Sequence, residues 1–170
     1  MKIAIIGYSG SGKSTMAKTL SEYYSCPLLY LDTIQFKENW KERDKDEAKA
    51  MVRDFMKNDS WVIDGNYTDF YQKERLLEAN QIIFLNFPTI LCLYQALKRY
   101  KKYKNQTRES AAQGCFEKMD FEFIWWILFG GRKKKHKENY KNIVKTYKAK
   151  TVVLKNRKQA NDFLMSYDKT

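Results

Sequence analysis

Short runs of consecutive apolar residues alternate along the chain with longer, charged stretches of helical periodicity. Five runs have this character: "KIAIIG" (Lys2–Gly7), "PLLYLD" (Pro27–Asp32), "WVIDG" (Trp61–Gly65), "QIIFLNFP" (Gln81–Pro88) and "TVVLK" (Thr151–Lys155). They are rich in Ile, Leu and Val and lack polar alternation. We therefore predict strands that are buried on both faces.

Amphipathic stretches separate these runs. "KSTMAKTLSEYY" follows the first run, "DEAKAMVRDFMKN" precedes the third, and "TILCLYQALKRYKKY" follows the fourth. Strands that alternate with helices form a parallel sheet covered on both sides, so the predicted fold class is a three-layer α/β fold. The chain of 170 residues has no internal repeat, low-complexity segment or Pro/Gly-rich linker, and we expect residues 1–170 to form one domain.

The chain carries a net charge of +12, with 44% hydrophobic and 31% charged residues. This composition is typical of a globular protein and excludes a disordered chain. The excess of cations indicates an anionic partner, either nucleotide phosphates, nucleic acid or an acidic membrane surface. The alternative is that many of the lysines only solvate exposed helix faces.

The three cysteines form no CxxC pair, which argues against a disulfide framework or a zinc site and favours a reducing cytoplasm. The N-terminus has the pattern of a strand rather than of a charged and then apolar leader. The most apolar run, "FEFIWWILFGG" (Phe121–Gly131), is about half the length needed to cross a bilayer and contains Glu122. We expect a cytoplasmic protein without a membrane anchor, in which this run is a helix that is buried or belongs to a lid.

The stretch "GYSGSGKST" contains the pattern G-x-x-x-x-G-K-[ST], formed by Gly7, Gly12, Lys13 and Ser14 between a predicted strand and a predicted helix. Gly10 and Gly12 permit backbone angles and a close approach that a Cβ would obstruct. The N–H groups of the loop then form a nest for phosphate oxygens at the positive end of the helix. Lys13 would reach the β- and γ-phosphates, and the Ser14 hydroxyl would ligate Mg²⁺. The sequence therefore predicts that ATP and Mg²⁺ bind at a loop of Gly7, Ser9, Gly10, Ser11, Gly12, Lys13, Ser14 and Thr15.

Ligands of an open α/β sheet collect at the carboxyl ends of its strands, so the residues that follow each apolar run are candidates. Asp64 closes the run in "WVIDGNY", where it is placed to hold Mg²⁺ through the water shell of the ion. Gly65 would let a second substrate approach the backbone, beside Asn66 and Tyr67. Asp32 ends its own run and would orient or deprotonate an acceptor hydroxyl, or bind the acceptor's base. For both aspartates the alternative is a cap on the following turn.

The stretches "GYSGSGKST" and "VIDGNY" together resemble the nucleoside-monophosphate-kinase branch of P-loop proteins. More narrowly, "LDTIQFKENW", "DSWVIDGNY", "IIFLNFP…LCLYQALKR" and "TRES…GCFEKMDFEFIWWI" resemble small bacterial DNA topology modulation proteins, which are related to adenylate kinase. The resemblance covers essentially the whole chain. It implies a core sheet of order 2-3-1-4-5, with Gly10–Thr15 on the donor phosphates and Asp64 assisting Mg²⁺.

The resemblance also assigns residues of the second half of the chain. Arg99, which lies eleven residues after Pro88, matches a lid-hinge arginine that contacts the transferred phosphate. The loop after the last strand, which cradles the donor base in such kinases, corresponds to Asn156, Arg157 and Lys158.

Two departures from the adenylate-kinase pattern concern the acceptor. The Phe-Pro-Arg that commonly follows Asp-Gly is replaced by Asn66, Tyr67 and Thr68, which removes an arginine for the acceptor phosphate. Tyr100 follows Arg99, so the usual double arginine is single. Both departures argue against an ordinary nucleoside monophosphate as the acceptor.

About 60 residues separate the fourth and fifth runs, far more than a crossover helix needs. We expect this helical insertion to supply a basic lid, approximately residues 99–135, that closes over the phosphates. Its candidate phosphate contacts are Arg99, Arg108 and Arg132, because guanidinium groups bind phosphate in a bidentate manner. Gly130 and Gly131 are a candidate hinge.

Two other interpretations of the insertion remain open. Lysines interleaved with Tyr94, Tyr100 and Tyr103 would track a nucleic-acid backbone and stack on bases. Alternatively, charge runs such as "RKKKHK" only solvate a helix surface, which would make His136 a plain surface residue, and "FIWWIL" is core.

The sequence thus favours a Mg²⁺-dependent phosphotransferase that moves the γ-phosphate of ATP to an unidentified small acceptor, with Lys13, Arg99 and Asp32 as catalytic residues. The alternative is a nucleotide-regulated DNA-binding protein, although no helix-turn-helix, zinc module or RNP-type signature is present. The acceptor and the oligomeric state stay open at this point.

Overall fold

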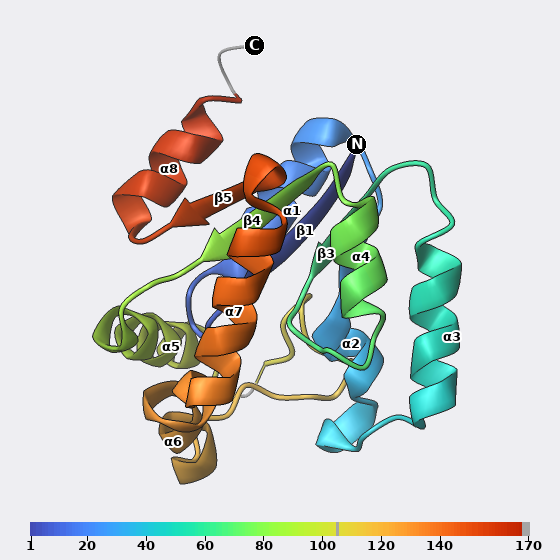
Figure 1. The fold of residues 1–170 in the computed structure, drawn as a ribbon. Helices are drawn as coiled ribbons and strands as arrows, with labels where there is room; N and C mark the ends of the chain where they lie inside the picture. The colour runs from blue at the N-terminus through green and yellow to red at the C-terminus, as the bar shows by residue number, and fades with distance from the viewer. Residues whose placement is uncertain (105, 168–170) are drawn as a thin grey trace.

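In the part of the chain that the structure describes, five strands form one parallel sheet, in the order β2-β3-β1-β4-β5 (Figure 1). The computed structural model describes residues 1–104 and 106–167. The strands are β1 (Lys2–Gly7), β2 (Leu28–Tyr30), β3 (Trp61–Asp64), β4 (Gln81–Leu85) and β5 (Thr151–Leu154). The α/β fold and the sheet order expected from the sequence are confirmed.

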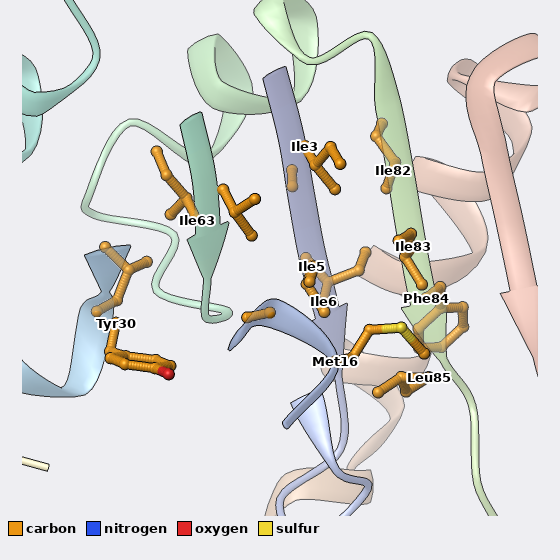
Figure 2. Packing of buried hydrophobic residues seen from close by; sticks show 14 of the residues in the cluster. Ile3, Ile5, Ile6, Met16, Tyr30, Ile63, Ile82, Ile83, Phe84 and Leu85 are labelled. Carbon is orange, nitrogen blue, oxygen red and sulfur yellow. The ribbon is translucent and has the colours of Figure 1, made fainter. Parts of the chain in front are cut away.

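The core lies on both faces of the three central strands. Ile5 and Ile6 of β1 lie between Ile63 of β3 and Ile83 of β4 (Figure 2), and all four are fully buried or nearly so. The edge strands β2 and β5 are only half-buried over most of their length, because each has a neighbour on one side only. Burial on both faces, expected for every strand, therefore holds for the central three.

Helices cover both faces of the sheet. In Figure 1, α4 and α7 lie in front of the strands and α1 lies behind them. The α-helices are α1 (Lys13–Tyr24), α2 (Leu31–Gln35), α3 (Lys45–Phe55), α4 (Gln72–Glu78), α5 (Thr89–Tyr103), α6 (Phe121–Leu128), α7 (Lys134–Thr146) and α8 (Arg157–Met165). The 3₁₀ helices within the described residues are η1 (Glu38–Trp40), η2 (Gly130–Arg132) and η3 (Lys148–Lys150).

The second strand is shorter than the apolar run "PLLYLD" suggests. The strand ends at Tyr30, and Leu31 and Asp32 already form the first turn of α2. Leu31 is fully buried, so the apolar pattern continues through the change from strand to helix. As a result Asp32 projects from a helix that begins at the carboxyl edge of the sheet, and not from a strand.

The segment between β4 and β5 contains α5, α6, α7 and the loop that joins α5 to α6. This loop packs on the chain that follows α2, where Ala111, Ala112 and Cys115 form a small buried cluster with Phe36 and Trp40. The backbone N–H of Trp40 donates to Cys115 Sγ at 3.2 Å, and Trp40 Nε1 donates to the Phe116 carbonyl oxygen at 3.1 Å. These contacts attach the insertion to the segment between α2 and α3.

The apolar helix α6 is more exposed than its composition predicts. Phe121 is 79% exposed and Trp125 and Trp126 are each 42% exposed, whereas Ile127 is buried. The expectation that "FIWWIL" is core is therefore wrong for most of its residues, because α6 lies in the insertion and packs mainly on α5 and η2. None of the helices in the described part of the chain combines the length and apolar character needed to span a membrane.

Candidate nucleotide and acceptor site

The phosphate loop connects β1 to α1 at the centre of the sheet. Gly10 has φ +80°, and a Cβ on it would lie 2.4 Å from the Cys92 carbonyl oxygen, so only glycine fits between the loop and α5. The Ser11 N–H donates to the Tyr8 carbonyl oxygen at 3.1 Å, and Gly12 caps α1 with φ 92°. Lys13 Nζ also donates to the Tyr8 carbonyl oxygen, at 3.2 Å, which places the ammonium group across the loop. The helix N-terminus and one cation therefore meet at this loop.

Asn66 ties the phosphate loop to the end of β3. Its side-chain oxygen accepts from the Gly7 N–H at 3.0 Å, and its side-chain nitrogen donates to the Gly7 carbonyl oxygen at 2.6 Å. The Tyr140 hydroxyl from α7 donates to the same carbonyl at 3.3 Å. Asn66, which the sequence analysis placed in acceptor binding, thus fixes the loop where it leaves β1.

Ser14 and Asp64 form the centre of a candidate Mg²⁺ site. Ser14 Oγ donates to Asp64 Oδ2 at 2.7 Å, and Asp64 is only 6% exposed. Its other oxygen, Oδ1, is buried and has no hydrogen-bond partner among the described residues. A hydroxyl and a carboxylate with an unused oxygen fit Mg²⁺. Among the described residues, no three His, Cys, Asp or Glu side chains are grouped so that they could hold a metal ion, so phosphates and water would supply the remaining ligands.

Burial has a measurable consequence at Asp64. Desolvation raises the pKa of this carboxyl from 3.8 to about 6, although the nearby Lys13 ammonium opposes the shift. Between about pH 4 and pH 6 the folded protein keeps a proton that the unfolded chain releases. The free energy of unfolding therefore decreases as the pH rises through this window, and the cost is complete at pH 7.

We expect Asp64→Asn to raise the free energy of unfolding of the ligand-free protein at pH 7 by about 1–3 kcal/mol, because the variant removes a buried charge and keeps an oxygen that accepts from Ser14. The gain should shrink toward pH 4. Urea unfolding at the two pH values measures it, with Asp162→Asn, an exposed acid on α8, as the control. A variant that is less stable than the wild type at pH 7 would show that Asp64 is stabilising when ionised.

Arg75, which the sequence analysis did not single out, organises the loop after β3. The residue is fully buried, and its guanidinium donates to the carbonyl oxygens of Phe70 (2.7 Å), Tyr67 (2.8 Å) and Gly65 (3.4 Å). Burial lowers the pKa of Arg75 to about 10. This arginine does not line the cleft, so it does not replace the acceptor-phosphate arginine that is missing at positions 66–68.

Arg75→Met should lower the free energy of unfolding by about 3 kcal/mol or more, because it leaves carbonyl oxygens in the protein interior without donors. Urea denaturation followed by circular dichroism measures the effect. Arg53→Met, at an exposed arginine of α3, should change stability by less than about 1 kcal/mol. Equal losses in the two variants would mean that the Arg75 hydrogen bonds do not hold the loop.

The side of the cleft that we expected from the sequence to bind the acceptor is formed by Asp32 and Tyr67. The Tyr67 hydroxyl donates to Asp32 Oδ1 at 2.8 Å, and the ring of Tyr67 stacks on Phe70 with 5.2 Å between centroids. Burial and the Asp32 carboxylate both raise the pKa of Tyr67, so its hydroxyl keeps its proton. Asp32, Tyr67, Lys13, Ser14 and Asp64 all line one cleft of about 1460 Å³.

Arg99 and Arg108 reach this cleft, whereas Arg132 has a different environment. The first two arginines line the cleft and form ion pairs with the buried carboxylate of Glu117. Arg132 Nη2 donates to the Phe87 carbonyl oxygen at 2.7 Å and to Cys92 Sγ at 3.4 Å. Its guanidinium lies 3.8 Å from the centre of the Tyr8 ring. The structure thus places Arg132 behind the phosphate loop, where it supports the loop instead of lining the cleft.

Of the three residues expected at the donor base, only Arg157 lines the cleft, whereas Asn156 and Lys158 do not. Asn156 caps α8, since its side-chain oxygen accepts from the Gln159 N–H at 2.9 Å, and it does not line the cleft. Arg157 does line the cleft. An Asn in front of a helix is an N-cap signal, and this signal could have assigned its role from the sequence.

Trp126 brings the insertion onto the phosphate loop. Its Nε1 donates to Ser9 Oγ at 3.2 Å, and its ring lies edge-on to His136 with 5.5 Å between centroids. His136 is half-buried and lines the cleft, so the expectation of a plain surface histidine is wrong. Gly130, a candidate hinge residue, packs so closely that a Cβ would lie 2.7 Å from the Trp125 ring.

Solved structures of small-molecule kinases have the same fold. Deoxyadenosine kinase from M. mycoides with bound dATP matches the chain with a TM-score of 0.55 and 17% identity, over 100% of each chain. Shikimate kinase from Acinetobacter baumannii in complex with shikimate matches with a TM-score of 0.51 and 14% identity, over 99% of this chain and 90% of that chain. Neither a protein-family model nor a curated protein matches the chain. At these identities the similarity shows a fold that the chain shares with these two kinases.

Proposed function

We propose that the protein is an ATP-dependent phosphotransferase that moves the γ-phosphoryl group of ATP to a hydroxyl group of a small acceptor. One observation carries this proposal: the phosphate loop with its Ser14–Asp64 pair and the Asp32–Tyr67 pair line the same cleft. The first pair and Lys13 suit a nucleoside triphosphate, and the second suits a molecule with a hydroxyl to be activated. The kinase names of the structural neighbours agree with this class of reaction.

Each residue then has a defined task in the transfer. Lys13 neutralises charge on the β- and γ-phosphates, and the N–H groups of the loop orient them. Ser14 and Asp64 would hold Mg²⁺, which supplies charge neutralisation at the phosphates when bound. Asp32 accepts the proton of the acceptor hydroxyl as that oxygen bonds to the γ-phosphorus and the bond to the bridging oxygen of ADP breaks. Tyr67 holds the Asp32 carboxylate in place.

The charges at Asp32 and at the Arg99–Glu117–Arg108 cluster favour a neutral alcohol over a nucleoside monophosphate as the acceptor. Asp32 is a carboxylate and would repel a second phosphate at this position. Arg99 and Arg108 share the carboxylate of Glu117, so two positive charges and one negative charge leave a single positive charge. That charge suits the transferred phosphoryl group, whereas Arg75 donates to backbone carbonyl oxygens of the loop after β3 and is not available to a second phosphate.

An acceptor screen tests the proposal. The purified chain is mixed with MgATP and, in separate reactions, with nucleosides, deoxynucleosides, nucleoside monophosphates, sugars and other polyols, and ADP release is recorded. We expect release that depends on one of the neutral hydroxyl compounds. Activity with monophosphates alone would refute the acceptor class, and no acceptor-dependent release with any compound would refute the phosphotransferase.

Nucleic-acid binding is the second candidate, in line with the resemblance to DNA topology modulation proteins. The net charge of +12 and the exposed lysines of and beside α7 next to the exposed Trp125 favour it. DNA affinity that persists at about 200 mM salt and responds to ATP would support this candidate. Affinity that disappears at that salt concentration would leave only non-specific attraction between opposite charges.

A further inference from the structure

Glu117 is a buried acid that joins the two arginines of the cleft. Its side chain is 3% exposed, Oε1 accepts from Arg99 Nε at 2.7 Å, and Oε2 accepts from Arg108 Nε. Buried carboxylates are rare unless they are paired, and this one is paired twice. No motif in the sequence marks Glu117.

Two sets of backbone and side-chain hydrogen bonds fix the position of Glu117. Its backbone N–H donates to the Gln106 carbonyl oxygen at 3.1 Å, within the loop between α5 and α6. The two preceding residues, Cys115 and Phe116, hold Trp40 through their hydrogen bonds. The carboxylate is therefore delivered between the arginines by a segment that is attached to the acceptor side of the cleft.

The pairing leaves part of each guanidinium unused. The Glu117 carboxylate accepts a hydrogen bond from the Nε atom of each arginine, and Arg108 Nη1 donates to Ser110 Oγ at 2.8 Å. The two terminal nitrogens of Arg99 and Nη2 of Arg108 have no hydrogen-bond partner within residues 1–104 and 106–167. Since both arginines line the cleft, these N–H groups are available to an anionic ligand there.

Without the carboxylate of Glu117, the positive charges of Arg99 and Arg108 would repel each other. Burial lowers the pKa of Arg99, and the charge of Arg108 lowers it further, whereas Glu117 raises it. Two guanidinium groups that are close and largely desolvated repel each other unless an anion lies between them. A carboxylate that accepts from the Nε atoms fixes the orientation of both guanidinium planes and leaves the terminal nitrogens free to bind the substrate.

We propose that Glu117 is a positioning residue for phosphoryl transfer: it holds Arg99 and Arg108 through their Nε atoms so that their terminal amino groups bind the transferred phosphoryl group. This inference rests on the proposed phosphotransferase function. Glu117 acts through the arginines and does not touch the substrate. Its contribution is therefore expected when charge redistributes on the phosphoryl group, rather than when ATP binds.

The test compares Glu117→Gln and Glu117→Asp with the wild type. Glu138→Gln is the control, because Glu138 is exposed on α7, pairs with Lys134 at 3.8 Å and does not line the cleft. Hydrolysis of γ-labelled MgATP, in which water takes the phosphoryl group, gives the rate without an identified acceptor. Calorimetry with Mg²⁺ and a non-hydrolysable ATP analogue gives the affinity. Phenylglyoxal labelling and mass spectrometry report the accessibility of each arginine.

Glu117→Gln should lower the rate at saturating MgATP by about 10- to 100-fold and leave the analogue affinity within about twofold. Glu117→Asp should restore part of the rate. In Glu117→Gln, labelling of Arg99 and Arg108 should rise severalfold while the buried Arg75 stays unlabelled, which shows that the fold is intact. Glu138→Gln should match the wild type in all three measurements.

Three results would overturn the inference. The first is an unchanged rate in Glu117→Gln, and the second is tighter analogue binding, which would mean that the carboxylate competes with phosphate for the arginines. The third is a rate loss that accompanies Arg75 labelling and equal loss of affinity, because this pattern reports unfolding. A wild-type chain that transfers no phosphoryl group to water or to any screened acceptor would instead refute the phosphotransferase function, and the inference with it.

Discussion

Lys13→Met is expected to reduce phosphoryl transfer by a factor of about 10³ or more. The Lys13 ammonium lies across the phosphate loop, where it donates to the Tyr8 carbonyl oxygen at 3.2 Å, and no other lysine is part of the loop. Methionine keeps the length of the side chain and removes its charge. The fold should therefore persist, while negative charge that develops between the β- and γ-phosphates is no longer neutralised.

The measurement pairs the rate with the affinity for MgATP. We expect the rate to fall much further than the affinity, and the far-ultraviolet circular dichroism spectrum to stay unchanged. Lys57→Met is the control, because Lys57 is exposed and pairs with Asp54 at 2.8 Å away from the cleft. If Lys13→Met binds and turns over ATP like the wild type, the loop is not the phosphate site and the proposed function is wrong.

Asp32→Asn is the second change with a large expected effect. It should lower transfer to a hydroxyl acceptor by about 10²–10⁴-fold, because the amide does not accept the proton of the attacking hydroxyl. The amide oxygen can still accept from the Tyr67 hydroxyl, so the loop after β3 should keep its structure. The affinity for MgATP should change by less than about twofold, since Asp32 lies on the acceptor side.

Steady-state kinetics with the acceptor found in the screen separates the possible roles of Asp32. A fall in kcat with little change in the acceptor KM indicates proton transfer, whereas a rise in KM alone indicates that Asp32 only binds the acceptor. Asp54→Asn, in the exposed ion pair on α3, is the control and should match the wild type. A kcat that is unchanged in Asp32→Asn would remove the general base from the proposal.

The phosphate loop and Asp64 at the end of β3 were predictable because their signals are local. The glycines and Lys13 of the phosphate loop lie within the seven residues 7–13, and Asp64 is the last residue of a buried run. Glycine at position 10 is required by a carbonyl of α5, yet the sequence pattern had already marked it. The single domain and the lid at residues 99–135 remain predictions, although the insertion itself is present.

The rest of the candidate site depends on contacts between distant parts of the chain, which the sequence does not reveal. Glu117 has no distinctive neighbours in the sequence, and its role arises only where the loop brings it to Arg99, 18 residues earlier. Arg132 looked equivalent to Arg99 and Arg108, but packing on Tyr8 directs it behind the phosphate loop. Asp32 was placed correctly at the sheet edge, although on a helix, because the apolar pattern does not distinguish the end of a strand from a buried helical turn.

The hydrogen bond between Trp126 and Ser9 gives the protein an internal optical reporter. The indole belongs to a helix of the insertion, 117 residues away along the chain from its partner in the phosphate loop. Any nucleotide that reorganises this loop changes the polarity and hydrogen bonding around the indole, and hence the wavelength of its emission. With Trp40, Trp61 and Trp125 replaced by phenylalanine, the fluorescence of the remaining tryptophan would record in real time whether the insertion moves before or after the nucleotide binds.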